Sequence, residues 1–362
     1  MHLPDTTSRR VGTRELIWFF ALLFISKILF ADIGDYVKNC GSAGYILTAA
    51  AGVFALVLFV LIIRLADGET DIIESAGKTF GKWGMRVTGV IITLLLVAQS
   101  GIMIRVYTDI ISSIVLPESS DVFIMLFLVA AVFFAAFAGT GTLAAYSYVA
   151  GIIFVITLAV ILVLNIPNYD VTNIYPLLGK GITGISAGVG AVGVYSDMLL
   201  LFLVAPYLTE KASVKKGGII SIVISAIVIT VTTLSYIMTV EYPFSSSLTL
   251  PVLEIAFDVN LDIVFQRAEG LFFFLWIFSG FIVTGAYLCF ALVTFVKSFN
   301  LTDRRAPIGA FVFVAACIAL IAGSSARERE LYRIIYSVFA VVSFALPLFV
   351  FGIKKFKRRQ IK

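Results

Sequence analysis

Apolar segments of about 20 residues recur along nearly the whole of this 362-residue chain, and they constrain its fold more than any other feature. A helix needs about 20 mostly apolar residues to cross the hydrocarbon core of a bilayer. Composition agrees, because 60% of the residues are hydrophobic and only 14% are charged, against roughly 25% charged in a soluble domain. The sequence predicts an all-α integral membrane protein with ten transmembrane helices, at approximately 14–34, 44–65, 84–114, 121–138, 142–166, 182–207, 217–240, 264–297, 307–325 and 334–353.

The domain organisation follows from the spacing of these segments. No polar block is long enough to fold separately, so residues 14–353 form a single predicted membrane domain. Residues 1–13 are an expected N-terminal tail and residues 354–362 a basic tail. The first apolar run has no small-residue cleavage site and many spans follow it, so it is expected to be a span rather than a signal peptide.

The 27 Lys and Arg residues indicate the orientation of the spans. If the N-terminus is cytoplasmic, most of them fall in cytoplasmic segments, as the positive-inside rule requires. Both termini are then cytoplasmic and the number of spans is even. The net charge of +5 therefore reflects topology rather than a nucleic-acid surface, although the basic tail could touch anionic lipid.

Metal and histidine chemistry are poor candidates for this chain. Cys40, Cys289 and Cys317 are widely separated, and the single histidine, His2, lies in a polar tail. This pattern provides neither a disulfide framework nor metal-ligand spacing. We expect no metal, no cofactor and no enzymatic activity.

Ten spans suggest two inverted repeats of five, and transporters of this kind bind their ligand near the midplane, where the first helix of each half is interrupted. In the sixth span, Gly190 and Gly193 precede Tyr195, Ser196 and Asp197. Glycines weaken a helix and let a ligand approach the backbone, although close helix packing is an alternative explanation. A carboxylate within a span costs about 2.5 to 3.5 kcal/mol on insertion scales, so Asp197 is expected to have a partner.

At the corresponding depth of the first span, the sequence places Ser26 and Lys27. Lys27 lies about 18 Å from the Arg14 end of the span, at 1.5 Å per residue. Three interpretations remain open. The side chain could extend to an interface, it could form a structural ion pair with Asp197, or its ammonium could hold a ligand carboxylate or occupy the place of a coupling cation.

Two further spans carry polar side chains. In the third, Arg105 and Asp109 are four residues apart and can pair on one helix face, whereas Gln99 lies deeper and is a more plausible site-facing group. In the eighth, Tyr287 brings a hydroxyl to an otherwise apolar helix.

The stretch Asn173-Ile-Tyr-Pro-Leu-Leu-Gly-Lys-Gly181, followed by a span that ends LLLFLVAP, resembles the spore germination permease family, the B subunits of bacterial germinant receptors. Arg267-Ala-Glu269 followed by Trp276 is similar to the start of that family's eighth span. The resemblance implies a fold of the amino acid, polyamine and organocation transporter superfamily, LeuT-like, with five plus five inverted repeats and interrupted helices 1 and 6.

The resemblance also implies a function. A B subunit is thought to bind a small germinant, commonly an amino acid, in the inner membrane of the spore and to act with a receptor A subunit and a lipoprotein C subunit. Lys27 departs from the small residues usual in that family, so the resemblance does not fix the ligand. The alternatives are a secondary amino acid transporter and a structural subunit with a vestigial site.

By position, the resemblance assigns the ligand site to Ser26, Gln99, Tyr195, Ser196 and Tyr287. To these we add two charged residues. Lys27 is expected to orient a ligand carboxylate, and Asp197 is expected either to be its counter-ion or to accept a hydrogen bond from a ligand amine.

Overall fold

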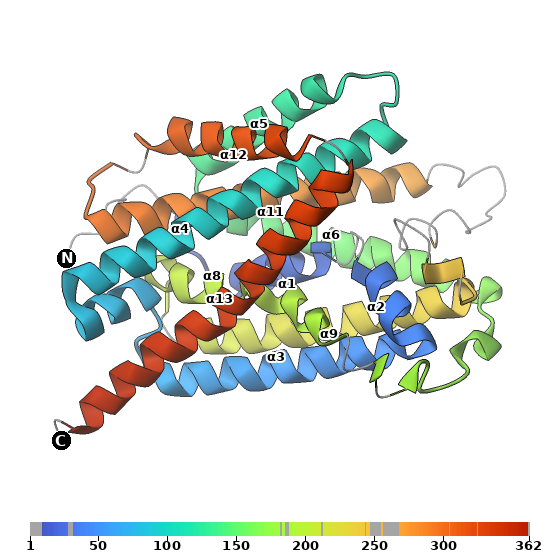
Figure 1. Ribbon diagram of the computed structural model, residues 1–362, viewed down its shortest axis with the longest axis horizontal. Coiled ribbons are helices and arrows are strands. Elements are labelled where there is room, and N and C mark those ends of the chain that lie inside the picture. The colour runs from blue at the N-terminus through green and yellow to red at the C-terminus, as the bar shows by residue number, and fades with distance from the viewer. Residues whose placement is uncertain are drawn as a thin grey trace.

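The computed structural model describes residues 9–27, 32–181, 183–184, 188–210, 213–242, 244–246, 255, 268–303, 305–323 and 325–360. Nearly all of this described chain is helical (Figure 1). Its α-helices are α1 (Thr13–Ser26), α2 (Asp32–Cys40), α3 (Gly44–Ala66), α4 (Ile72–Ile114), α5 (Asp121–Ala138), α6 (Thr140–Leu164), α8 (Met198–Val204), α9 (Ser213–Thr239), α11 (Ala268–Phe299), α12 (Ile308–Ala322) and α13 (Ser325–Gln360). Short 3-10 helices are η2 (Gly41–Ala43), η3 (Ile166–Asn168), η4 (Val171–Ile174), η5 (Gly188–Asp197), η6 (Ala205–Tyr207) and η7 (Phe244–Ser246).

Within the described residues, eight helical segments are long and apolar enough to cross a membrane. The protein is therefore an integral membrane protein, as its sequence predicts. The predicted total of ten spans stays a prediction, because α12 is shorter and α1 contributes only 14 residues to the first predicted span. The eight segments are Tyr36–Ala66, Ile72–Ile114, Asp121–Ala138, Thr140–Leu164, Gly190–Tyr207, Val214–Thr239, Phe273–Phe299 and Arg327–Arg358.

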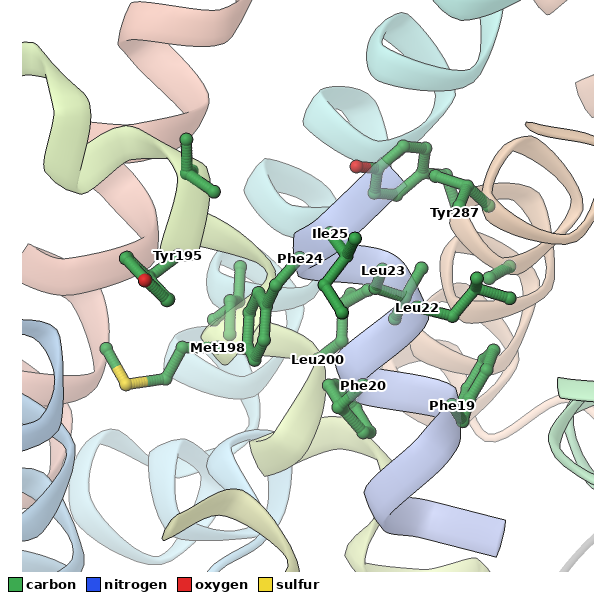
Figure 2. Close-up of a cluster of buried hydrophobic side chains, with 14 of the residues drawn as sticks. Phe19, Phe20, Leu22, Leu23, Phe24, Ile25, Tyr195, Met198, Leu200 and Tyr287 are labelled. Atoms are coloured by element: carbon green, nitrogen blue, oxygen red, sulfur yellow. The ribbon is translucent and has the colours of Figure 1, made fainter. Parts of the chain in front are cut away.

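Helix α1 lies in the interior of the bundle. Its last eight residues, Phe19 to Ser26, are all buried, which is expected for a helix that is apolar on every side. It packs against α6 and α9, and Phe19 stacks on Phe290 of α11. Figure 2 shows Phe24 of α1 beside Tyr195 and Met198. The middle and the C-terminal end of α1 are therefore fixed by side-chain packing.

The first and sixth predicted spans are both interrupted, as the sequence predicts. Helix α1 ends at Ser26 with Lys27 as its C-terminal cap, and α2 begins at Asp32. In the sixth span, the 3-10 helix η5 runs for 10 residues up to Asp197, where α8 begins. Runs of 3-10 helix longer than about four residues are uncommon, because their hydrogen-bond geometry is poor. The glycines of this span thus lie in a segment that departs from α-helix.

Two long helices frame this region. In α4, Gly81 adopts a non-helical conformation (φ 73°) that separates a short amphipathic stretch from the long apolar part of the helix. Helix α11 runs antiparallel to α4. Two hydroxyls of α4 donate to carbonyl oxygens of α11: Thr93 Oγ1 to Ala291 O (3.4 Å) and Ser100 Oγ to Thr284 O (3.3 Å). These two bonds fix the register in which α11 lies on α4.

Helix α13 runs diagonally across one face of the molecule, where it packs on α3, α4, η5 and α8 (Figure 1). The predicted basic tail continues this helix as far as Gln360. Its basic side chains contact the loop between α3 and α4, where Lys354 Nζ lies 2.8 Å from Glu69 Oε2 and Arg358 Nη1 lies 2.8 Å from Asp67 Oδ2. Hydrogen bonds from Lys354 and Lys78 lower the pKa of the Glu69 carboxyl to about 2. The end of α13 is thereby joined to the α3–α4 loop.

The conspicuous stretch from Asn173 to Gly181 contacts the end of α2. The Lys180 backbone N–H donates to Cys40 O (3.0 Å), and the Lys180 ammonium donates to Lys38 O (2.6 Å). The Ser42 hydroxyl donates to Pro176 O (2.5 Å). This stretch is therefore bonded to the end of α2 and to η2, which follows it.

Candidate ligand-binding site

The Lys27 ammonium lies at the junction between the two interrupted spans, with only 1% of its residue surface exposed. Its Nζ is 2.9 Å from Asp197 Oδ2 and donates hydrogen bonds to Ser196 Oγ (3.0 Å) and to Val194 O (3.3 Å). The end of α1 places this lysine, because the ammonium follows directly on the last buried turn of the helix. Of the three interpretations of Lys27, the geometry matches the ion pair and not a side chain that extends to an interface.

Asp197 is the point at which η5 passes into α8. It is fully buried, and its second carboxylate oxygen, Oδ1, accepts a hydrogen bond from the Tyr287 hydroxyl of α11 (2.9 Å). A lone buried carboxylate would be costly, whereas a pair with additional hydrogen bonds offsets much of that cost. Lys27, Asp197 and Tyr287 thus join α1, the sixth span and α11 through one polar group.

Two aromatic rings of α13 cover the ammonium, and sequence reasoning missed both. Lys27 Nζ lies 5.6 Å from the centroid of the Tyr336 ring and 5.8 Å from that of Phe339. Phe339 also makes an edge contact with Tyr287, with ring centroids 6.0 Å apart. Aromatic residues at helical spacing in an apolar span are read as packing residues, so the sequence held no signal that distinguishes these two.

The other predicted ligand-site residues lie around this junction in different ways. Ser196 contacts Lys27, whereas the Ser26 hydroxyl donates to Leu23 O within its own helix (3.2 Å). Tyr195 packs on Phe24 with ring centroids 5.5 Å apart (Figure 2). Its buried hydroxyl has no hydrogen-bond partner among the described residues.

The two glycines predicted at the helix break differ in their surroundings. Gly193 lies against α13, since a Cβ atom there would be 2.9 Å from Cε1 of Tyr336. Gly190 is exposed, and a Cβ atom there would meet nothing within 4 Å. Gly193 therefore permits the close approach of Tyr336 to the broken helix.

Arg105 lies near the C-terminal end of α4 and forms ion pairs with two carboxylates. Its Nη2 lies 2.5 Å from Asp109 Oδ1, as the four-residue spacing predicts, and 3.1 Å from Asp121 Oδ2 at the start of α5. The second carboxylate was not anticipated. The arginine thus links two helices rather than one turn of a single helix.

Gln99 is fully buried in α4, next to Ser100. Neither its Oε1 nor its Nε2 has a hydrogen-bond partner among the described residues. Arg267, at the start of the eighth predicted span, lies outside the described residues.

A bundle of apolar helices around interrupted segments, with a buried polar junction, is the fold of membrane permeases and transporters. The fold matches that of a solved nucleobase-cation-symport-1 family transporter, Mhp1, in a closed conformation with bromovinylhydantoin bound. That match has a TM-score of 0.64 and 13% identity, and it covers 93% of this chain and 78% of the transporter.

The particular family follows from the sequence match. The family described as "Spore germination protein" matches residues 19–330, so this chain belongs to that family of spore germination permeases. Spore germination protein KB of Bacillus subtilis (strain 168) is 21% identical over 209 residues. The match spans 56% of this chain and 56% of that relative, so the chain spans about half the length of the curated relative it matches.

Proposed function

We propose that this protein is the B subunit of a spore germinant receptor, which binds a small germinant at the junction of Lys27, Asp197 and Tyr287. The observation that carries the proposal is the buried ion pair between the two interrupted spans. Such a pair places opposite charges where helix ends meet, and separating the two spans would leave both charges unpaired. Ligand binding that alters this pair therefore changes how the two spans are held together.

An amino acid is the germinant class that fits these groups. Its carboxylate can replace Asp197 as the partner of Lys27, and its ammonium can replace Lys27 as the partner of Asp197. Tyr287 already donates a hydrogen bond to Asp197, and Ser196 accepts one from Lys27, so both can also hydrogen-bond to a ligand that takes the place of either charge. A zwitterion thus complements both charges without leaving either of them unpaired.

The proposed receptor acts in the inner membrane of the spore, with both chain termini in the cytoplasm. A receptor A subunit and a lipoprotein C subunit receive the conformational change. The relative named as a spore germination protein supports this assignment. The protein itself does no covalent chemistry in this account.

The proposal is tested in spores that carry Lys27→Met, with Tyr287→Phe as a milder variant that keeps the ion pair. Germination is followed at increasing amino acid concentrations, and membrane levels of the chain are measured by immunoblot. We expect both variants to need more amino acid than wild type. Lys297→Met is the control, because Lys297 forms an ion pair with Asp71 away from the junction. Wild-type responses from both site variants at equal membrane levels would refute the receptor site.

A secondary amino acid transporter is the second candidate. It is favoured by the surroundings of Lys27, because carboxylate, hydroxyl and carbonyl oxygens are also the ligands that a hard cation prefers. Lys27 would then stand in for a bound coupling cation. Accumulation of a labelled amino acid in vesicles that contain this chain alone would favour the transporter, and the receptor proposal expects none.

A further inference from the structure

Gln99 is a carboxamide in the interior of the bundle that has no hydrogen-bond partner in the part of the chain that the structure describes. The residue is 0% exposed, and both polar atoms of its side chain lack a hydrogen-bond partner among the described residues. Buried polar groups in folded proteins are almost always hydrogen-bonded, because an unmet donor or acceptor retains its full desolvation penalty. A side chain that departs from this rule in both atoms is a candidate for contact with a ligand.

The register of α4 on α11 places Gln99 at the level of Tyr287, which is bonded to the Lys27 junction. Its neighbour Ser100 donates to Thr284 O of α11, and Tyr287 follows Thr284 by three residues, or about 4.5 Å along the axis. The Tyr287 hydroxyl donates to Asp197. Gln99 and Tyr287, which contacts the ion pair, therefore lie within about one helical turn of each other along the α4–α11 pair.

The charged side chains at this level of the bundle already have partners, whereas the polar groups that lack one within the described chain are uncharged. Lys27 has three oxygen partners, and Asp197 has Lys27 and Tyr287. The hydroxyls of Thr284 and Tyr195 are buried and, like the Gln99 amide, have no partner among the described residues. The groups that remain for recognition beyond the ion pair are thus uncharged donors and acceptors.

We propose that Gln99 selects a germinant that carries a hydrogen-bond donor next to an acceptor, as in a carboxamide, a lactam or a ureide. The inference rests on the proposed function for the location of the site and adds the chemical class that this site accepts. The Gln99 side chain offers one acceptor and one donor group, so it forms a cyclic pair of hydrogen bonds with such a ligand. A ligand without that pair leaves the buried amide unmet and binds about 10- to 100-fold more weakly.

The first test needs no ligand. Gln99→Met replaces the unmet amide with an apolar side chain of similar length, so we expect a higher unfolding midpoint for the purified, detergent-solubilised chain than for wild type. An amide held by structural partners gives the opposite result, because its removal would lower the midpoint. A lower midpoint for Gln99→Met therefore overturns the inference.

The second test compares matched probes by their effect on the wild-type midpoint. Glutamine is compared with methionine, which has similar size but no donor–acceptor pair, and hydantoin with 1,3-dimethylhydantoin. We expect glutamine or hydantoin to raise the midpoint, their partners to fail, and Gln99→Met to abolish the shift. Thr140→Val is the control, since it removes a buried hydroxyl at the start of α6 that also lacks a hydrogen-bond partner among the described residues, and it is expected to keep the shift.

The outcomes separate the inference from the function on which it rests. If methionine or alanine raises the midpoint as much as glutamine does, and Gln99→Met keeps that shift, the ligand site stands and the assigned chemical class is wrong. If no amino acid or hydantoin changes the wild-type midpoint, both the inference and the proposed ligand site fail.

Discussion

Among single residues, Lys27 matters most, because its ammonium joins the two interrupted spans. Lys27 lies deep in an apolar span, where an unpaired charge would be costly, and it meets Asp197 at 2.9 Å. Tyr287 and Ser196 complete the hydrogen bonding of the pair. A pair with this geometry joins two helix ends, and removing either member leaves the other charge unpaired in the interior.

We predict that Lys27→Met and Asp197→Asn each lower the free energy of unfolding by about 3 to 5 kcal/mol, because each leaves one buried group without its partner. The double variant should recover part of that loss, since neither charge then remains. The measurement is a double-mutant cycle on the purified chain. Losses that simply add would show that the two side chains are not coupled.

Two rare residues made this pair one of three interpretations of Lys27, but the sequence could not show which of them holds or what surrounds the pair. A lysine and an aspartate within apolar spans stand out in any sequence, so both could be found. Tyr336 and Phe339 could not, because α13 reaches the junction only through the way the helices pack. The second carboxylate at Arg105 was missed for the same reason, since Asp121 belongs to another helix.

At the scale of elements, the short helix α2 depends on contacts with the stretch from Asn173 to Gly181. Lys180 bonds to Lys38 and Cys40 through its side chain and its backbone. Gly179 has a φ of 52°, and a Cβ atom there would lie 1.9 Å from Cys40 O. The glycine is therefore required both by its backbone conformation and by the close approach of α2.

We predict that Gly179→Ala lowers the unfolding midpoint more than Gly181→Ala does. Both positions have positive φ, which costs an alanine about 1 to 2 kcal/mol. Only at position 179 does the added methyl also collide with the backbone of Cys40, whereas at position 181 it meets nothing within 4 Å. The two variants are compared by thermal unfolding of the purified chains, and equal losses would show that this contact does not hold α2.

Helix existence was the part of the fold that the sequence predicted best, since long apolar runs admit few alternatives. The segments expected from 44–65 and 121–138 correspond closely to α3 and α5. The ends were harder to predict. The sequence did not indicate where the last helix ends: α13 continues through the basic residues after 353 to Gln360, with ion pairs to Asp67 and Glu69.

At the scale of the whole molecule, the fold brings the ends of two interrupted spans together beneath α13. A solved transporter shares this fold at 13% identity, so the arrangement tolerates almost complete sequence change. Fold alone does not distinguish a carrier from a sensor. Function must therefore be tested at the site, which in this chain consists of Lys27 at the junction and the neutral groups around it.

The most direct test of the central claim is the unfolding midpoint of the purified chain against a panel of amino acids. A ligand that binds only the folded state at 100 times its Kd stabilises that state by about 2.7 kcal/mol. We predict that at least one amino acid raises the midpoint of wild type and of Lys297→Met but not that of Lys27→Met. An equal rise in Lys27→Met would contradict the account, because the ligand would then bind without the junction.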